Sequence, residues 1–70
     1  MGLFKLRIRA LAKKKGLTLK AISAQANVPY STVATYANSS GMATADISAV
    51  IRIAQVLGAS VEDLVDVIED

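Results

Sequence analysis

The chain has 70 residues, 53% of them apolar, and contains neither Cys nor His. Without Cys there is no disulfide and no thiolate metal site, and without His the commonest metal ligand and general base is missing. No apolar run approaches the roughly 20 residues that a membrane span requires, and the N-terminus does not resemble a signal peptide. We therefore expect one cytoplasmic domain, residues 1–70, without a metal, a cofactor or a small-molecule ligand.

The charged side chains are divided along the chain, although the net charge is only +2. Seven of the eight Lys and Arg residues precede the first acid, and the acids gather toward the C-terminal end. A basic surface attracts a polyanion and an acidic end repels it, so we expect any nucleic acid to lie near the first two helices. Charge alone leaves open the alternative of a solvated helix surface followed by an acidic tail.

Apolar residues recur at a helical period almost throughout, and strand-like alternation is not evident, which predicts an all-α domain of five helices. The first helix is expected over residues 3–15, and Gly16 supplies its left-handed end. Thr18 is a good N-cap for a second helix over Leu19–Ala26, and Asn27 tolerates the positive φ that ends it.

The second half of the chain predicts three more helices. Pro29 lies at or just before the first turn of the third, and residues 38–45 form a loop by composition. Thr44 or Asp46 caps the fourth helix, whose predicted core stripe comprises Ile47, Val50, Ile51, Ala54 and Leu57. Ser60, with Asp63 three residues on, resembles a capping box and starts a fifth helix, on which the apolar residues are Val61, Leu64, Val65 and Ile68.

Residues 19–37 carry the most informative pattern, because two short helices flank the sequence Ala-Asn-Val. Helices that cross steeply in a tight corner need a small side chain at Ser23 and apolar anchors at positions such as Ile22, Val28 and Val33. This segment resembles the helix-turn-helix of the Cro and phage-repressor class, the XRE family. The family more often has Ala at the Ser23 position and Gly at the Asn27 position.

The resemblance extends over nearly the whole chain. It includes the Ile-Arg-Ala-Leu start at residues 8–11, the Lys-Lys-Gly-Leu-Thr corner at residues 14–18 and the segment at residues 53–60. It implies a repressor-like DNA-binding domain in which the third helix enters the major groove. The implied base-contact candidates are Tyr30, Ser31, Ala34 and Thr35. The phosphate-contact candidates are Thr18, Lys20, Thr32, Asn38, Ser39 and Ser40, each of which is alternatively a solvated cap or loop residue.

Two departures from the family bear on function. No Lys or Arg occurs between Lys20 and Arg52, although phosphate neutralisation supplies much of the energy of DNA binding. We therefore expect a shallow salt dependence and a modest affinity, unless Arg7, Arg9 or the cluster Lys13–Lys15 reaches the DNA backbone. Ala12 and Ala37 occupy positions where many family members carry a paired Arg and Glu, and losing both leaves no orphan charge.

Two functions remain open. The first is a sequence-specific regulator, as in a phage genetic switch, that binds a near-palindromic double-stranded operator as a homodimer. The second is a modulator or antirepressor that forms a hetero-complex with another repressor, which the excess of apolar residues favours. Candidates for a partner interface are Leu19, Tyr30, Met42, Ile53, Val56 and Val67. An enzyme is not expected, because we find no nucleophile paired with a base and no Gly-rich phosphate loop.

Overall fold

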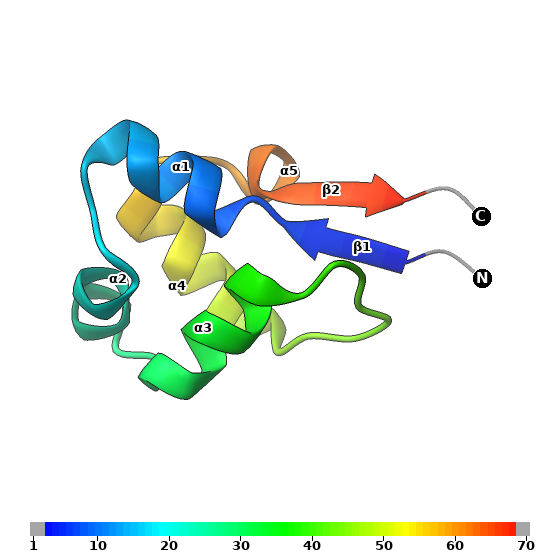
Figure 1. The fold of residues 1–70 in the computed structure, drawn as a ribbon, viewed down its shortest axis with the longest axis horizontal. Helices are drawn as coiled ribbons and strands as arrows, with labels where there is room; N and C mark the ends of the chain where they lie inside the picture. The colour runs from blue at the N-terminus through cyan, green and yellow to red at the C-terminus, as the bar shows by residue number, and fades with distance from the viewer. Residues whose placement is uncertain (1–2, 69–70) are drawn as a thin grey trace.

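Helix α4, Ile47–Leu57, lies at the centre of the fold, where α1, α2 and α5 pack against it (Figure 1). The structure is a computed structural model that describes residues 3–68. The other elements are β1 Leu3–Leu6, α1 Ile8–Lys15, α2 Leu19–Ala26, α3 Tyr30–Asn38, α5 Val61–Leu64 and β2 Val65–Ile68. The five expected helices are present, but the domain is not purely all-α, because β1 and β2 form a two-stranded antiparallel sheet.

The first correction concerns the expected helix over residues 3–15. The helix begins only at Ile8, and residues 3–6 form β1. Leu6 is buried while Lys5 is exposed, which is the alternation of a strand with one covered face. Phe4 also fits a helical stripe with Ile8, so local spacing does not separate the two interpretations. The deciding partner of β1 lies about sixty residues along the chain, in β2.

The second correction concerns the fifth helix, which is a single turn. Ser60 caps it as expected, because its Oγ accepts a hydrogen bond of 3.0 Å from the amide of Asp63. After Leu64 the chain extends into β2, where three of the four residues are β-branched and therefore suited to a strand. The amide of Arg7 donates to the carbonyl of Leu64 at 2.8 Å, which continues the strand pairing up to the helix ends.

The third correction concerns the rotation of α4. Its buried residues are Ala49, Val50, Ile53, Ala54 and Leu57. Ile53, expected to be free for a partner, is therefore fully buried, whereas Ile47 and Ile51 of the expected core stripe are 63% and 42% exposed. Apolar residues lie almost all round this helix, so hydrophobic periodicity does not fix which face turns inward. Val56 is half-buried and packs against the core.

The predicted helix ends are confirmed. Gly16 and Gly58 have φ of 71° and 65°, in the left-handed region, and end α1 and α4. Thr18 Oγ1 accepts a hydrogen bond from the amide of Ala21, and of the two candidates for the start of α4 it is Asp46 that caps the helix, through the amide of Ser48.

A substitution series tests the two left-handed glycines. Gly16→Ala and Gly58→Ala should each lower the free energy of unfolding by about 1–2 kcal/mol, because a Cβ strains this conformation. Gly41→Ala is the control, since Gly41 has no positive φ and its Cβ would make only ordinary contacts with Leu3 and Ile68. Urea denaturation followed by circular dichroism measures the three values. Equal losses for all three variants would contradict the explanation.

Candidate nucleic-acid interface

The corner between α2 and α3 is built on one residue in an unusual conformation. Asn27 has φ of 55°, and it is the one non-glycine residue among positions 3–68 with positive φ. The carbonyl of Ser23 accepts hydrogen bonds from the amides of Asn27 and Val28. The Ser23 hydroxyl donates in the other direction, to the carbonyl of Val28 at 2.6 Å. Ser in place of the more usual Ala therefore adds a hydrogen bond across the turn.

Apolar anchors hold the two helices of the corner against the core. Ile22 and Val33 are fully buried, and Ala26 and Val28 are nearly so. These burials confirm the inward positions that the sequence predicts. Tyr36 is half-buried, and its hydroxyl accepts a hydrogen bond of 2.9 Å from the amide of Asp46, which links α3 to the start of α4.

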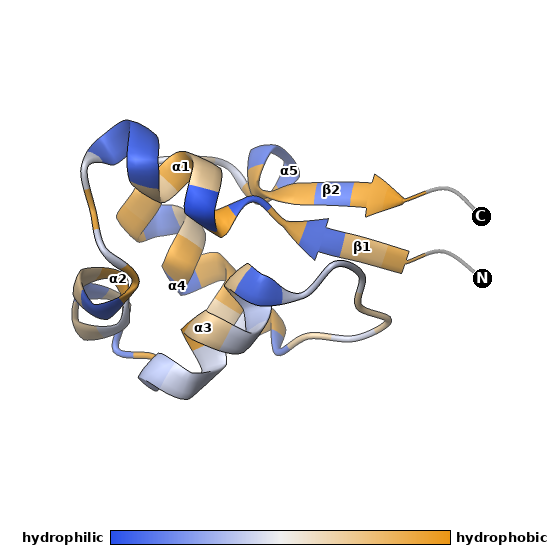
Figure 2. Cartoon of the chain, in the orientation of Figure 1, coloured by the Kyte–Doolittle hydropathy of each residue, from blue (hydrophilic) through white to orange (hydrophobic). Residues whose placement is uncertain are grey.

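The outer face of α3 carries the predicted base-contact residues. Tyr30 is 52% exposed, Ser31 and Thr35 are exposed, and Ala34 is half-buried. In Figure 2 the first turn of α3 is pale, because its Tyr, Ser and Thr residues have an intermediate hydropathy. The outer face of α3 therefore carries no charged side chain, and its role in base contact remains a prediction.

The predicted phosphate-contact residues differ in how free their side chains are. Lys20 and Ser40 are exposed, and Thr32 is half-buried. Asn38 Oδ1 accepts hydrogen bonds from Arg9, and the Ser39 hydroxyl bonds with the backbone of Gly41. The Thr18 oxygen acts as a helix cap. Thr18, Asn38 and Ser39, three of the six candidates, thus already form hydrogen bonds within the domain.

Arg9 is one of the cations that the sequence left open as a contact to the DNA backbone, but its contact with Asn38 was not predicted. Its Nε and Nη2 lie 3.0 and 2.5 Å from Asn38 Oδ1, so its guanidinium sits at the C-terminal end of α3. This pair joins α1 to α3 near positions 12 and 37, where the family often has Arg and Glu. The sequence shows only that Arg9 lies outside the apolar stripe of the first helix. It does not show its partner Asn38, which is 29 residues away.

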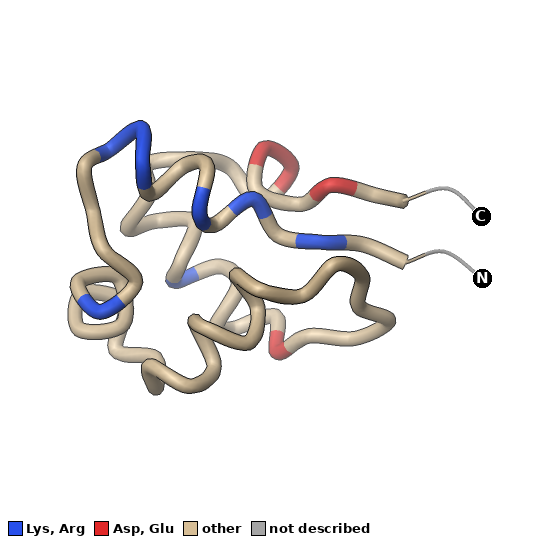
Figure 3. Tube along the Cα trace, in the orientation of Figure 1, with Lys and Arg blue, Asp and Glu red and all other residues tan. Residues whose placement is uncertain are grey.

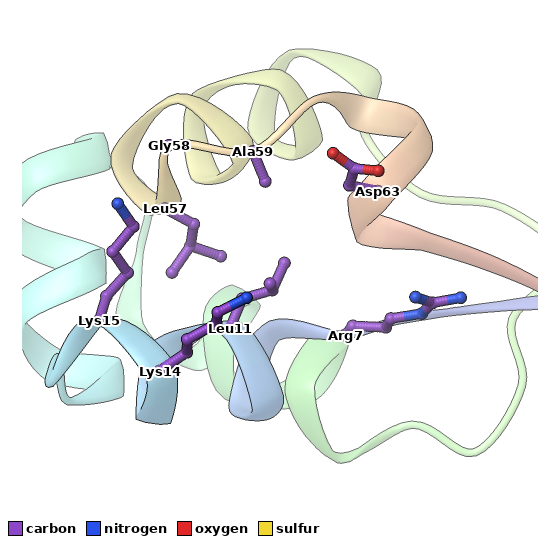
Figure 4. Close-up of a pocket in the computed structure, with 8 residues that line it drawn as sticks. All are labelled: Arg7, Leu11, Lys14, Lys15, Leu57, Gly58, Ala59 and Asp63. Atoms are coloured by element: carbon purple, nitrogen blue, oxygen red, sulfur yellow. The ribbon is translucent and has the colours of Figure 1, made fainter.

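The remaining cations lie on other surfaces. Figure 3 shows Lys and Arg along β1, α1, α2 and α4, with none on α3 or on the loop that follows it. A hollow of about 610 Å³ separates α1 from the α4–α5 junction (Figure 4). Arg7, Lys14 and Lys15 line it together with Asp63. Arg7, Lys14 and Lys15 therefore lie on the α1 side of the molecule, whereas α3, the helix predicted to contact bases, carries no charged residue.

The predicted partner-interface residues differ in how exposed their side chains are. Tyr30 and Val67 are 52% and 66% exposed, although Val67 lies on β2 and not on a helix. Leu19 and Met42 are half-buried and pack against the core. Met42 is further held by backbone hydrogen bonds to Phe4, which fasten the loop after α3 to the edge of β1.

The left-handed corner residue yields a direct test. Asn27→Val should lower the free energy of unfolding by about 1–2 kcal/mol or more, because a β-branched residue is strained at positive φ. Asn27→Gly should stay within about 0.5 kcal/mol of the parent, since Gly adopts this conformation freely but loses more entropy on folding. Chemical denaturation of the three proteins gives the comparison. A Val variant as stable as the Gly variant would contradict the assigned geometry.

Among the described residues, no helix is both long and apolar enough to cross a membrane. Searches of curated proteins and of solved structures each returned no match. A family model described as helix-turn-helix matches residues 8–64, which span α1 to α5 and include the whole corner. The chain therefore belongs to the Cro/repressor-type (XRE) helix-turn-helix family, whose members are DNA-binding regulators of transcription.

Proposed function

We propose that this protein is a small transcriptional regulator of the Cro/phage-repressor type that reads operator DNA with α3, as in a phage genetic switch. The proposal rests on the two faces of α3: one face is buried against the core, and the opposite face is exposed to solvent. Val33 is fully buried, while Ser31 and Thr35 are exposed to whatever docks. Contacts at its C-terminal half, Tyr36 with Asp46 and Arg9 with Asn38, hold the helix in one position.

The chemistry of this face suits direct readout of limited stringency. Hydroxyls of Ser31 and Thr35 donate or accept, so they discriminate bases less sharply than a bidentate Arg or Asn does. The Ala34 methyl and the Thr35 methyl suit a thymine methyl group. Thr18, Lys20, Thr32 and Ser40 would fix the register on the phosphates. Asn38 would donate its Nδ2–H to a phosphate while its Oδ1 keeps the bond from Arg9, and Ser39 would do so by releasing its hydroxyl from the Gly41 carbonyl. A homodimer would place two copies of α3 about 34 Å apart on a near-palindromic operator.

The base-contact assignment predicts a loss of affinity. The double variant Tyr30→Ala/Ser31→Ala should bind operator DNA about tenfold more weakly, because a good bidentate contact is worth about 1–3 kcal/mol and two weaker contacts together should reach the lower part of that range. Both side chains are exposed, so the folded state should persist. Fluorescence anisotropy against genomic operator fragments measures the affinity, with Ser48→Ala as a control that removes an exposed hydroxyl from α4. Equal affinity of the parent protein for every sequence would refute the proposal.

The neutral surface of α3 predicts an unusual response to salt. If only Arg9 and Lys20 neutralise phosphates, binding to a single half-site should show a log–log slope of about −2, whereas six to ten phosphate contacts give about −5 to −9. Titrations at several salt concentrations supply the slope. A slope of about −4.5 would mean that Lys13, Lys14 and Lys15 also neutralise phosphates, and it would contradict the assigned orientation on DNA.

A second candidate function is a modulator or antirepressor that acts by binding a partner repressor. The cation-free α3 and the exposed Ile47, Ile51 and Val67 favour it. Co-expression with a repressor encoded by a neighbouring gene, followed by size-exclusion chromatography, tests this alternative. A stable complex would support it, and a homodimer that binds its operator tightly without help would remove its rationale.

A further inference from the structure

A basic hollow lies between α1 and the junction of α4 with α5 (Figure 4). Its volume is about 610 Å³, and none of the base-contact candidates on α3 lines it. We call it the α1–α5 hollow and define it by Arg7, Leu11, Lys14, Lys15, Ala59 and Asp63. Three of these residues are cations and one is an acid, so positive charge predominates along its walls.

The hollow exists because the chain between α4 and α5 carries only small side chains. Gly58, Ala59 and Ser60 link the two helices, and none of these side chains is long enough to fill the space beside α1. Leu11 is half-buried and Leu57 is buried, and Figure 4 shows both between the two walls. The hollow therefore combines an apolar floor with a charged rim.

The α1 wall has a repeating pattern. Arg7, Leu11 and Lys14 follow one another at intervals of four and three residues, so they lie along one face of the helix. At a rise of 1.5 Å per residue, Arg7 and Lys14 are about 10 Å apart along the helix axis. The wall thus offers a cation, a leucine and a second cation in a row.

The cations of this wall differ in how far they are already engaged. Arg7 Nη2 lies 3.5 Å from Asp66 Oδ1, but the Arg7 side chain is 51% exposed and its guanidinium has five N–H donors. A Cβ at Gly58 would lie 3.0 Å from Lys15 Nζ, so this ammonium group sits at the C-terminal end of α4, where a cation is favourable. Lys14 is exposed, and within residues 3–68 it forms no ion pair. Arg7 and Lys14 are therefore the cations available to a ligand.

The lining suits an acidic peptide better than a nucleic acid. A DNA duplex presents closely spaced phosphates, which Asp63 and the neighbouring exposed Glu62 would repel. Its phosphate backbone also has no aliphatic group to cover Leu11. A peptide can place two separated carboxylates and one aliphatic side chain, and its backbone N–H groups are donors for the Asp63 carboxylate. Charge and apolar area together thus favour the peptide.

We propose that the α1–α5 hollow is a docking site for an extended acidic segment of a partner protein, with the pattern acid-x-aliphatic-x-acid, where x is any residue. Alternate side chains of an extended chain share one face, and the first and fifth are about 13 Å apart. The long side chains of Arg7 and Lys14 allow them to reach two carboxylates at that spacing, with the aliphatic group over Leu11.

This inference goes beyond the proposed function and does not rest on it. Figure 1 shows α1 and the first turn of α3 on opposite sides of α4, and the hollow opens beside α1. A partner docked there would leave the outer face of α3 free for DNA. The site would therefore allow the domain to hold DNA and a second protein together.

Binding of a synthetic peptide to the full chain tests the proposal. The probe is the fluorescein-labelled peptide Gly-Ser-Glu-Ser-Leu-Ser-Glu-Ser-Gly, followed by fluorescence anisotropy at low ionic strength. We expect saturable binding with a Kd below about 1 mM. Replacing both Glu residues by Gln should weaken it about tenfold or more, and replacing Leu by Ser about threefold or more, because these changes remove the ion pairs and the apolar contact. Absence of saturable binding, or equal affinity for the Glu and Gln peptides, would overturn the proposal.

Two adjacent lysines provide a matched pair of variants. Lys14→Glu should raise the Kd of the Glu peptide about tenfold or more, because it reverses a charge on the wall of the hollow. Lys13→Glu makes the same charge change but should raise the Kd less than about threefold, since Lys13 lines a different hollow. Both side chains are exposed in the last turn of α1, so any loss of stability is shared. Equal effects of the two variants would show unspecific attraction to α1 and overturn the site.

A measurement on the unmodified protein identifies the occupant. Amide chemical shifts recorded by NMR should change at residues 11, 14, 58 and 59 as the Glu peptide is added, and little at residues 30, 31 and 35. Displacement of the peptide by an equal concentration of a DNA duplex of unrelated sequence would identify nucleic acid as the occupant and overturn the proposal. The variant Tyr30→Ala/Ser31→Ala should bind the peptide like the parent, so failure of peptide docking and failure of DNA reading by α3 are distinguishable.

Discussion

The reversal of the chain at Asn27 sets how α3 lies against α2, and with it which side chains of α3 face outward. A single left-handed residue turns the backbone between α2 and α3, and the two hydrogen-bonding groups of Ser23 hold that turn from both directions. Ile22 and Val33 are both fully buried in the same core cluster, which sets the inward face of α3. The side chains that face outward are thereby determined by the ones that face inward.

The cations do not lie on the surface that we propose to read DNA. Cations gather on β1 and α1, where Arg7 and Lys5 neutralise Asp66 across the sheet and Arg9 binds the end of α3. They therefore contribute to holding the sheet and α3 in place, and the uncharged face of α3 must rely on hydroxyls, methyl groups and a tyrosine. Long-range attraction to DNA would come from the α1 side, whereas discrimination between sequences would come from α3.

Features encoded by neighbouring residues were predictable from the sequence. Gly16, Asn27 and Gly58 end helices through local backbone conformation, and Thr18 and Ser60 cap helices through their own side chains. The buried anchors of the corner fit the same local rules. The outward positions were implied by the family resemblance; of these, Tyr30, Ser31 and Thr35 are exposed and Ala34 is half-buried.

Features that depend on distant partners were not predictable. Residues 3–6 and 65–68 become strands because each supplies the other with backbone partners, which a local period does not reveal. The rotation of α4, which buries Ile53 and exposes Ile47, depends on α1, α2 and α5 packing around a helix that is apolar on nearly every side. The Arg9–Asn38 contact likewise exists only once α1 and α3 are side by side.

The central claim is that α3, and not the basic surface of α1, meets the bases. Amide chemical shifts of the labelled protein, recorded by NMR during titration with an operator duplex, test it most directly. We expect the largest changes at residues 30, 31 and 35 and at the start of α2, with small changes at residues 13–15. Changes concentrated at residues 13–15, with α3 unaffected, would contradict it.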